Sequence, residues 1–199
     1  MNKIKLISIV VFLVATGIFF FIGKSGKAPA VSLEEKEFSP KNATYYIEGR
    51  TVTLVNGIAE TEVVPESATK VTTRYFGNEV KHDLNNDGRE DVAFILTQET
   101  GGSGTFFYFV AALNTTTGYI GSQAVFLGDR IAPQTTEMEE GITVMGTKRQ
   151  NVIIVNYAVR LPNEPFTASP SVGKSLWLKL DPVTMQFGEV AQNFEGESR

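Results

Sequence analysis

The segment "DLNNDGRED", residues 83–91, places oxygen-bearing side chains at alternate positions and follows the third with a glycine. Counted from Asp83, positions 1, 3 and 5 hold Asp83, Asn85 and Asp87. A calcium ion takes six to eight oxygen ligands, and a tight loop can supply them from alternate residues. The spacing therefore predicts one Ca²⁺ site in this segment.

The rest of the segment completes this hypothesis. Gly88 at position 6 permits a sharp turn, and Arg89 at position 7 would offer its backbone carbonyl. Asp91 at position 9 would offer its carboxylate directly or through a water molecule, while Glu90 would face solvent or an outer shell. The predicted metal ligands are Asp83, Asn85, Asp87, Arg89 and Asp91. The alternative is a metal-free Asp-Gly turn held by Asx-type hydrogen bonds, in which three carboxylates would repel one another.

This loop resembles the DxDxDG-type calcium loops of EF-hands, dockerins and FG-GAP repeats over about nine residues. It departs from an EF-hand at position 12, where Phe94 stands in place of a bidentate glutamate, and no helical pattern flanks it. Without that glutamate the site lacks two oxygen ligands and one charge, so we expect a modest Kd on the order of 10⁻⁵–10⁻³ M, as in extracellular modules. Such a site would be filled outside cells and largely empty in a cytoplasm.

The sequence contains few residues that could form a catalytic site. His82 is the only histidine and cysteine is absent, so a nucleophilic triad or a multi-histidine zinc site is not expected. The carboxylates of "TTEMEEG" (Glu137, Glu139, Glu140) are interpreted as an acidic surface loop rather than an acid–base pair. We therefore expect a non-enzymatic protein; the alternative is a hydrolase that acts on envelope glycans or peptides.

Three further groups of residues have a structural and a functional interpretation. The stretch "GGSGTFFYF" (101–109) leads into a strand rather than a helix, which favours a hairpin turn beside the ion loop over a phosphate loop; a binding loop with Ser103 or Thr105 is the alternative. Asp129 and Arg130 in "LGDRIAP" are expected to form a structural ion pair or turn. Aromatic side chains are expected in the core, with a carbohydrate groove as the alternative: Tyr45, Tyr46, Tyr108, Tyr119 and Trp177.

Short apolar or alternating runs separated by turn residues dominate the chain after residue 42. They include "RTVTLVNG", "KVTTRYF", "DVAFILTQ", "TFFYFVAAL", "GITVMG", "NVIIVNYAV" and "SLWLKL". These runs are typical of strands, and no apolar stripe of helical period spans three turns. The pattern predicts an all-β soluble domain, a sandwich or partly open barrel.

The N-terminal segment is different in character. Residues 6–23 carry no charge and would span roughly 27 Å as a helix, close to the thickness of a bilayer core. We interpret residues 1–23 as one transmembrane signal anchor, 24–41 as a polar linker, 42–188 as an extracytoplasmic β domain and 189–199 as a flexible tail. A cleaved signal peptide and a buried core helix are the alternatives. Flanking lysines are nearly balanced, and a short tail before a first apolar run favours an N-terminus inside the cell.

The net charge of the sequence limits the classes of partner that we expect. The first 27 residues hold four of the 18 Lys and Arg and none of the 22 Asp and Glu, so residues 28–199 carry a net charge of −8. An acidic body is a poor nucleic-acid binder. The segments "DLNNDGREDVAFILTQETGGSGTFFYFVAAL" and "GDRIAPQ" resemble uncharacterised bacterial envelope proteins over residues 42–180. That resemblance implies a bacterial, exported, non-enzymatic β domain. From the sequence as a whole we expect a cell-membrane protein with an extracytoplasmic C-terminal domain, whose partner is an envelope protein or a glycan.

Overall fold

The computed structural model describes residues 38–62, 69–139, 141, 143–144, 147–148 and 150–190. Within them a short 3₁₀ turn, η1 (Pro40–Asn42), precedes 14 strands. The first eight are β1 (Thr44–Ile47), β2 (Arg50–Thr53), β3 (Ile58–Glu62), β4 (Lys70–His82), β5 (Asp91–Glu99), β6 (Phe106–Thr115), β7 (Gly118–Gly121) and β8 (Val125–Asp129). The others are β9 (Ala132–Glu139), β10 (Thr143–Val144), β11 (Thr147–Lys148), β12 (Val152–Val159), β13 (Val172–Asp181) and β14 (Gln186–Glu189).

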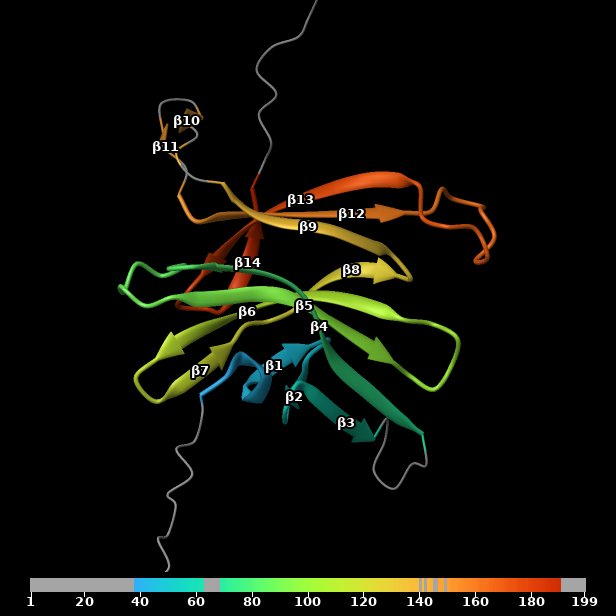
Figure 1. The fold of residues 1–199 in the computed structure, drawn as a ribbon, viewed down its shortest axis with the longest axis horizontal. Coiled ribbons are helices and arrows are strands. Elements are labelled where there is room, and N and C mark those ends of the chain that lie inside the picture. The colour runs from blue at the N-terminus through green and yellow to red at the C-terminus, as the bar shows by residue number, and fades with distance from the viewer. Residues whose placement is uncertain are drawn as a thin grey trace, which may run out of the picture. The chain divides into compact units, whose positions relative to one another are not determined.

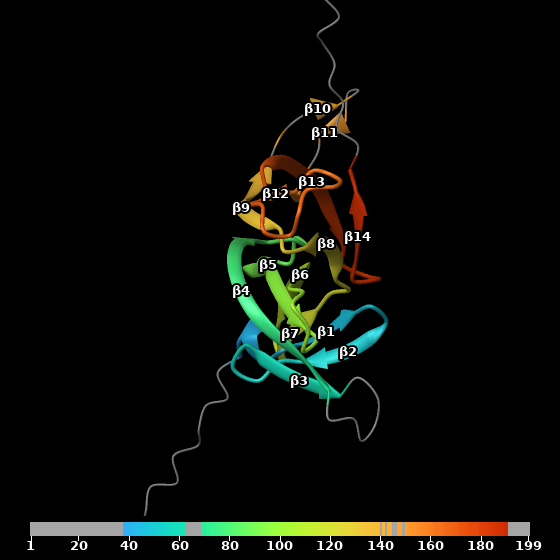
Figure 2. The same ribbon diagram turned by 90° about the vertical axis from the view of Figure 1, so that its right-hand side faces the viewer.

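Two antiparallel sheets are stacked on one another (Figures 1 and 2). The larger has the order β3-β4-β5-β6-β7, with β8 also paired to β6, and the smaller has the order β14-β13-β12-β9. Strand β5 is buried along eight of its nine residues, because it lies in the middle of the larger sheet and both of its faces are covered. This explains why its sequence is a continuous apolar run rather than an alternating one.

The first hydrophobic core fills the space between the two sheets. Ala93, Ile95 and Phe109 contribute from the larger sheet, and Ile153 and Val155 contribute from the smaller sheet. All five are fully buried. Successive strand residues point to opposite faces, so the intervening residues of β5 and β6 must be covered by something else.

The β1–β2 hairpin provides that cover. Tyr45, Ile47 and Val52 pack against Phe94 and Val110 in a second core cluster on the outer face of the larger sheet. The hairpin also approaches β7 closely. A Cβ at Gly121 would lie 2.3 Å from the carbonyl oxygen of Thr44, so only glycine permits this contact.

The prediction of an all-β fold is confirmed for the described residues, and the stacked sheets give it a sandwich-like character. The predicted transmembrane segment (1–23), residues 24–37 of the linker and residues 191–199 of the tail lie outside those residues. Among the residues that are described, no helix is long and apolar enough to cross a membrane.

Candidate functional site

The 83–91 segment connects the end of β4 to the start of β5. Two residues in it adopt left-handed backbone conformations, Asn86 with φ 61° and Gly88 with φ 84°. Nothing lies within 4 Å of a Cβ built on Gly88, so the backbone angle, and not crowding, favours glycine there. These two positions turn the chain back on itself between two antiparallel strands.

Three side chains fold inward over the amides of the loop. The Asp83 carboxylate accepts hydrogen bonds from the backbone N–H groups of Asp87 at 3.0 Å and Gly88 at 2.8 Å. Asn85 Oδ1 also accepts from Asp87 N at 3.0 Å, and Asp87 Oδ1 accepts from Arg89 N at 2.9 Å. Asp83 and Asn85 thus share the Asp87 amide, and the bonds from Asp87 N to Asn85 and from Arg89 N to Asp87 are of the Asx type expected of a metal-free turn.

A guanidinium group lies on one of these carboxylates. Arg89 Nη2 is 2.6 Å from Asp87 Oδ2, and Asn85 Nδ2 donates to the same oxygen at 2.9 Å. The hydrogen bond from Asn85, followed by that from the Arg89 backbone, lowers the pKa of Asp87. Arg89 Nε is itself held by the carbonyl oxygen of Asn114 at 2.8 Å. The sequence pointed to the backbone carbonyl of Arg89, whereas this side-chain contact was not anticipated.

Asp91 has a structural role that spacing alone did not reveal. Its side chain is fully buried, and its two oxygens accept from the backbone N–H groups of Leu84 at 2.9 Å and Asn114 at 2.7 Å. Burial raises the pKa of Asp91; these two hydrogen bonds oppose the rise, and the nearby charges of Asp87 and Asp83 add to it. Each carboxylate oxygen of Asp91 can still accept another interaction, so the assignment of Asp91 as a metal ligand stays a prediction.

The second sheet also contacts the loop. Asn151, which precedes β12, donates through Nδ2 to the carbonyl oxygens of Leu84 at 3.0 Å and Asp83 at 3.2 Å. Sequence reasoning missed this residue because it stands in "GTKRQN", which carries only a turn signal.

The donor set suits a hard cation. Carboxylate, amide and carbonyl oxygens are the ligands that calcium prefers, and the loop contains no sulfur or imidazole donor. No group of three or more His, Cys, Asp or Glu side chains in the described part of the chain is arranged to hold a metal, so a site here depends on Asn85 and the backbone. Glu90 is exposed, and its carboxylate lies 3.7 Å from the Lys81 ammonium group.

The other candidates lie away from the loop. The "GGSG" turn connects β5 to β6 as predicted, but at the end of β5 opposite to the ion loop, so the expectation that it lies beside the loop is wrong. Arg130 instead binds it: Nε donates to the Ser103 carbonyl at 2.8 Å and Nη2 to Ser103 Oγ at 3.1 Å. Asp129 accepts from Thr105 N at 3.0 Å and lies 3.1 Å from Arg130 Nη1, which is the expected structural ion pair.

His82 and two of the three carboxylates expected in an acidic surface loop lie in strands. His82 ends β4 and pairs with Asp91 in the sheet. Glu137 and Glu139 lie on β9, and Glu140 is outside the described residues. Of the aromatic residues, Tyr45 and Tyr108 are buried and Tyr46 is half exposed.

No protein-family model, curated protein or solved structure matches this chain. The resemblances to calcium loops and to envelope proteins therefore stay predictions.

Proposed function

We propose that the chain is a membrane-anchored, extracytoplasmic β domain stabilised by one calcium ion, and that it acts as a binding or envelope-scaffolding module. The observation that carries the calcium proposal is the inward folding of Asp83, Asn85 and Asp87 over the amides of their own loop. Those hydrogen bonds orient three oxygen-bearing side chains and leave some lone pairs on their oxygens that could bind an ion.

A calcium ion in this loop would have a structural consequence. Asp91 ties the loop to the end of β6 through Asn114, and Asn151 ties it to the second sheet. Ligands drawn together by an ion would reinforce the junction between both sheets. The ion would also offset the repulsion between Asp83 and Asp87.

Binding is preferred to catalysis because the sequence supplies one histidine and no cysteine. Export is supported by the apolar N-terminal segment and by the affinity expected of the loop. A Kd on the order of 10⁻⁵–10⁻³ M suits the calcium concentrations outside cells.

Thermal unfolding of the full chain, with calcium and with a chelator, tests the calcium proposal. Calcium at a hundredfold excess over Kd should stabilise the domain by about 2.7 kcal/mol, or roughly 5–10 °C in Tm. Asp87→Ala removes a central ligand and should abolish most of the rise. Glu90→Ala, which removes an exposed carboxylate that lies 3.7 Å from the Lys81 ammonium group, should retain it. Equal shifts in wild type and Asp87→Ala, or no shift in either, would refute the site.

A further inference from the structure

The β1–β2 hairpin covers only part of the outer face of the larger sheet. Its strands have four residues each and turn at Glu48 and Gly49, which have φ angles of 50° and 75°. The strands beneath it, β4, β5 and β6, are 13, 9 and 10 residues long. Beyond the hairpin turn the sheet face therefore continues as the floor of an open cavity of about 750 Å³. That volume is in the range of about 300–1,000 Å³ found for small-molecule sites.

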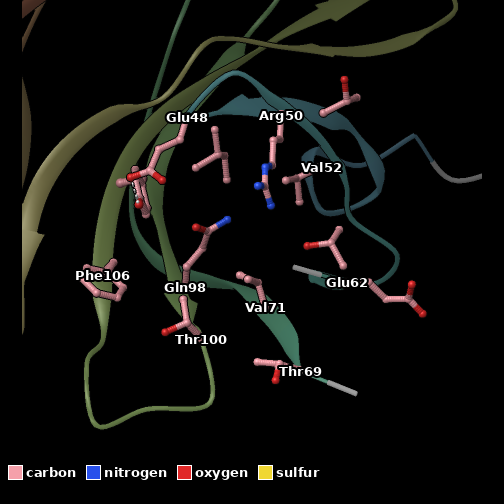
Figure 3. A pocket seen from close by; sticks show the side chains of 13 residues that line it. Glu48, Arg50, Val52, Glu62, Thr69, Val71, Gln98, Thr100 and Phe106 are labelled. Atoms are coloured by element: carbon pink, nitrogen blue, oxygen red, sulfur yellow. Dashed lines mark hydrogen bonds between the residues drawn. The ribbon is translucent and has the colours of Figure 1, made fainter. Parts of the chain in front are cut away.

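Planar polar groups from the hairpin and from the sheet point into this cavity. Figure 3 shows Arg50 from the hairpin and Gln98 from β5 reaching into the same space. Gln98 is nearly buried, and its Nε2 donates to Thr73 Oγ1 at 3.0 Å, which holds the amide in place. Glu48 stands at the same rim, where its Oε1 accepts from the Tyr108 hydroxyl at 2.7 Å. The cavity thus presents preorganised groups that can both donate and accept hydrogen bonds.

Aromatic rings continue from the cavity along the sheet. Phe106 and Tyr108 line it, and Phe126 is the direct cross-strand neighbour of Tyr108, with ring centroids 5.3 Å apart. Phe126 remains 54% exposed although it lies among other rings. Tyr108 is buried beneath these neighbours, so the flat apolar surface offered to a ligand beside the cavity is that of Phe126 and part of Phe106.

Charge decides between ligand classes. The charged residues that line the cavity are Glu48, Arg50 and Glu62, two acids and one base. The body of the protein is also acidic, with a net charge of −8 over residues 28–199, so an anionic ligand would meet repulsion. A purely apolar ligand would remove water from these charged groups without offering them hydrogen bonds, which is unfavourable in free energy.

A neutral sugar satisfies both parts of the cavity. Adjacent hydroxyl groups of a sugar can pair with planar carboxylate, guanidinium and amide groups, and threonine hydroxyls add further partners. The C–H face of the ring can pack on aromatic side chains. The lining threonines are Thr51, Thr61, Thr69 and Thr100.

We propose that this cavity, with Arg50, Gln98 and Glu48 as polar contacts, Phe106 in its lining and Phe126 beside it as stacking surface, binds a neutral saccharide. The inference rests on the proposed role as a binding module and names the ligand class. It does not depend on the calcium ion, because the ion loop lies at the opposite end of β5.

Titration calorimetry on the full chain, in a detergent without a sugar headgroup, tests this inference. The probes are neutral trisaccharides of glucose, N-acetylglucosamine and mannose, with trigalacturonate as an anionic comparison and a lysine-rich peptide as a cationic one. At least one neutral trisaccharide should bind, and more tightly than trigalacturonate or the peptide. Binding of no neutral trisaccharide, or tighter binding of either charged probe, would overturn the inference.

Variants locate the site. Arg50→Met changes an exposed side chain and should weaken saccharide binding roughly tenfold, the effect of one charge-assisted hydrogen bond. The matched control is Arg74→Met, an exposed arginine next to Thr73 that faces the other side of β4, and it should bind as wild type does. If Arg50→Met binds as tightly as wild type, the site is misplaced.

Asp87→Ala distinguishes a failure of the calcium proposal from a failure of the saccharide proposal. Loss of the calcium-induced Tm rise in that variant, with saccharide binding retained, supports both proposals. A normal calcium response without any saccharide binding overturns only the cavity assignment.

Discussion

The side-chain amide of Asn151 donates a hydrogen bond to the backbone carbonyl oxygen of Leu84 at 3.0 Å. The two residues are 67 positions apart and lie next to strands of different sheets, Leu84 in the loop after β4 and Asn151 just before β12. Leu84 is a buried member of the core between those sheets. One amide therefore fixes the ion loop to the second sheet at the edge of the core.

Replacing this amide should destabilise the fold. Asn151 has a φ of 57°, a conformation that glycine adopts without strain, so Asn151→Gly removes the side chain and keeps the backbone. The loss of a buried donor should lower the free energy of unfolding by about 1–3 kcal/mol. That corresponds to roughly 2–12 °C in Tm for a domain of this size, measured by thermal denaturation.

Asn163→Gly provides the control, because Asn163 has a φ of 77° and an exposed side chain. It should unfold close to the wild-type temperature. Equal Tm values for the two variants would show that the Asn151 bridge adds nothing to stability.

Arg89 should compete with calcium. Its guanidinium lies 2.6 Å from Asp87 Oδ2, where a metal ion would also interact. Arg89→Met removes that positive charge and should raise calcium affinity by roughly two- to fivefold, the scale of an exposed charge pair. Calorimetric titration with calcium measures the change. A lower affinity in Arg89→Met would mean that the guanidinium, through Asn114, holds the loop in its binding shape.

The hydrophobic runs of the sequence located the central strands well. "DVAFILTQ" and "TFFYFVAAL" became β5 and β6, because strands buried on both faces need continuous apolar side chains. The alternate spacing of Asp83, Asn85 and Asp87 predicted metal ligands, and that assignment stays a prediction. The strand assignments succeeded because they depend on local patterns that a short window contains.

Relationships between distant segments were not accessible in this way. Spacing placed Asp91 among the ligands but gave no sign that its carboxylate would be buried against Asn114. Arg50 and Gln98 face one another only because the hairpin folds across the sheet, and Gln98 looks like the end of an apolar run. The "GGSG" turn was expected beside the ion loop, but the two segments flank a single extended strand, β5, whose length separates them.

The N-terminal apolar segment should retain the protein in membranes. If residues 6–23 span a bilayer, the full-length chain should stay in the pellet after a carbonate wash, since alkaline carbonate releases peripheral proteins only. Immunoblotting of pellet and supernatant measures this. A soluble mature form beginning near Val31 would instead support a cleaved signal peptide.

Alkaline unfolding should depend on Tyr45. Its side chain is fully buried, its hydroxyl donates to the Pro40 carbonyl at 2.6 Å, and burial raises its pKa. The pKa values of Tyr75 and Tyr108 are also raised, mainly by burial. A tyrosine with a raised pKa in the folded state favours folding while it is neutral. That contribution is complete below the unfolded pKa of about 10 and is lost as pH rises above it.

Tyr45→Phe separates this titration from the others. Near neutral pH the variant should be less stable by about 1 kcal/mol, because the Pro40 carbonyl loses its donor. Above about pH 10 its free energy of unfolding should fall less steeply than that of wild type, by up to about 1.4 kcal/mol per pH unit, the effect of one proton. Tyr46→Phe changes a half-exposed side chain in the same strand and should match wild type in urea titrations across this range. Parallel slopes for wild type and Tyr45→Phe would show that Tyr45 does not take part in alkaline unfolding.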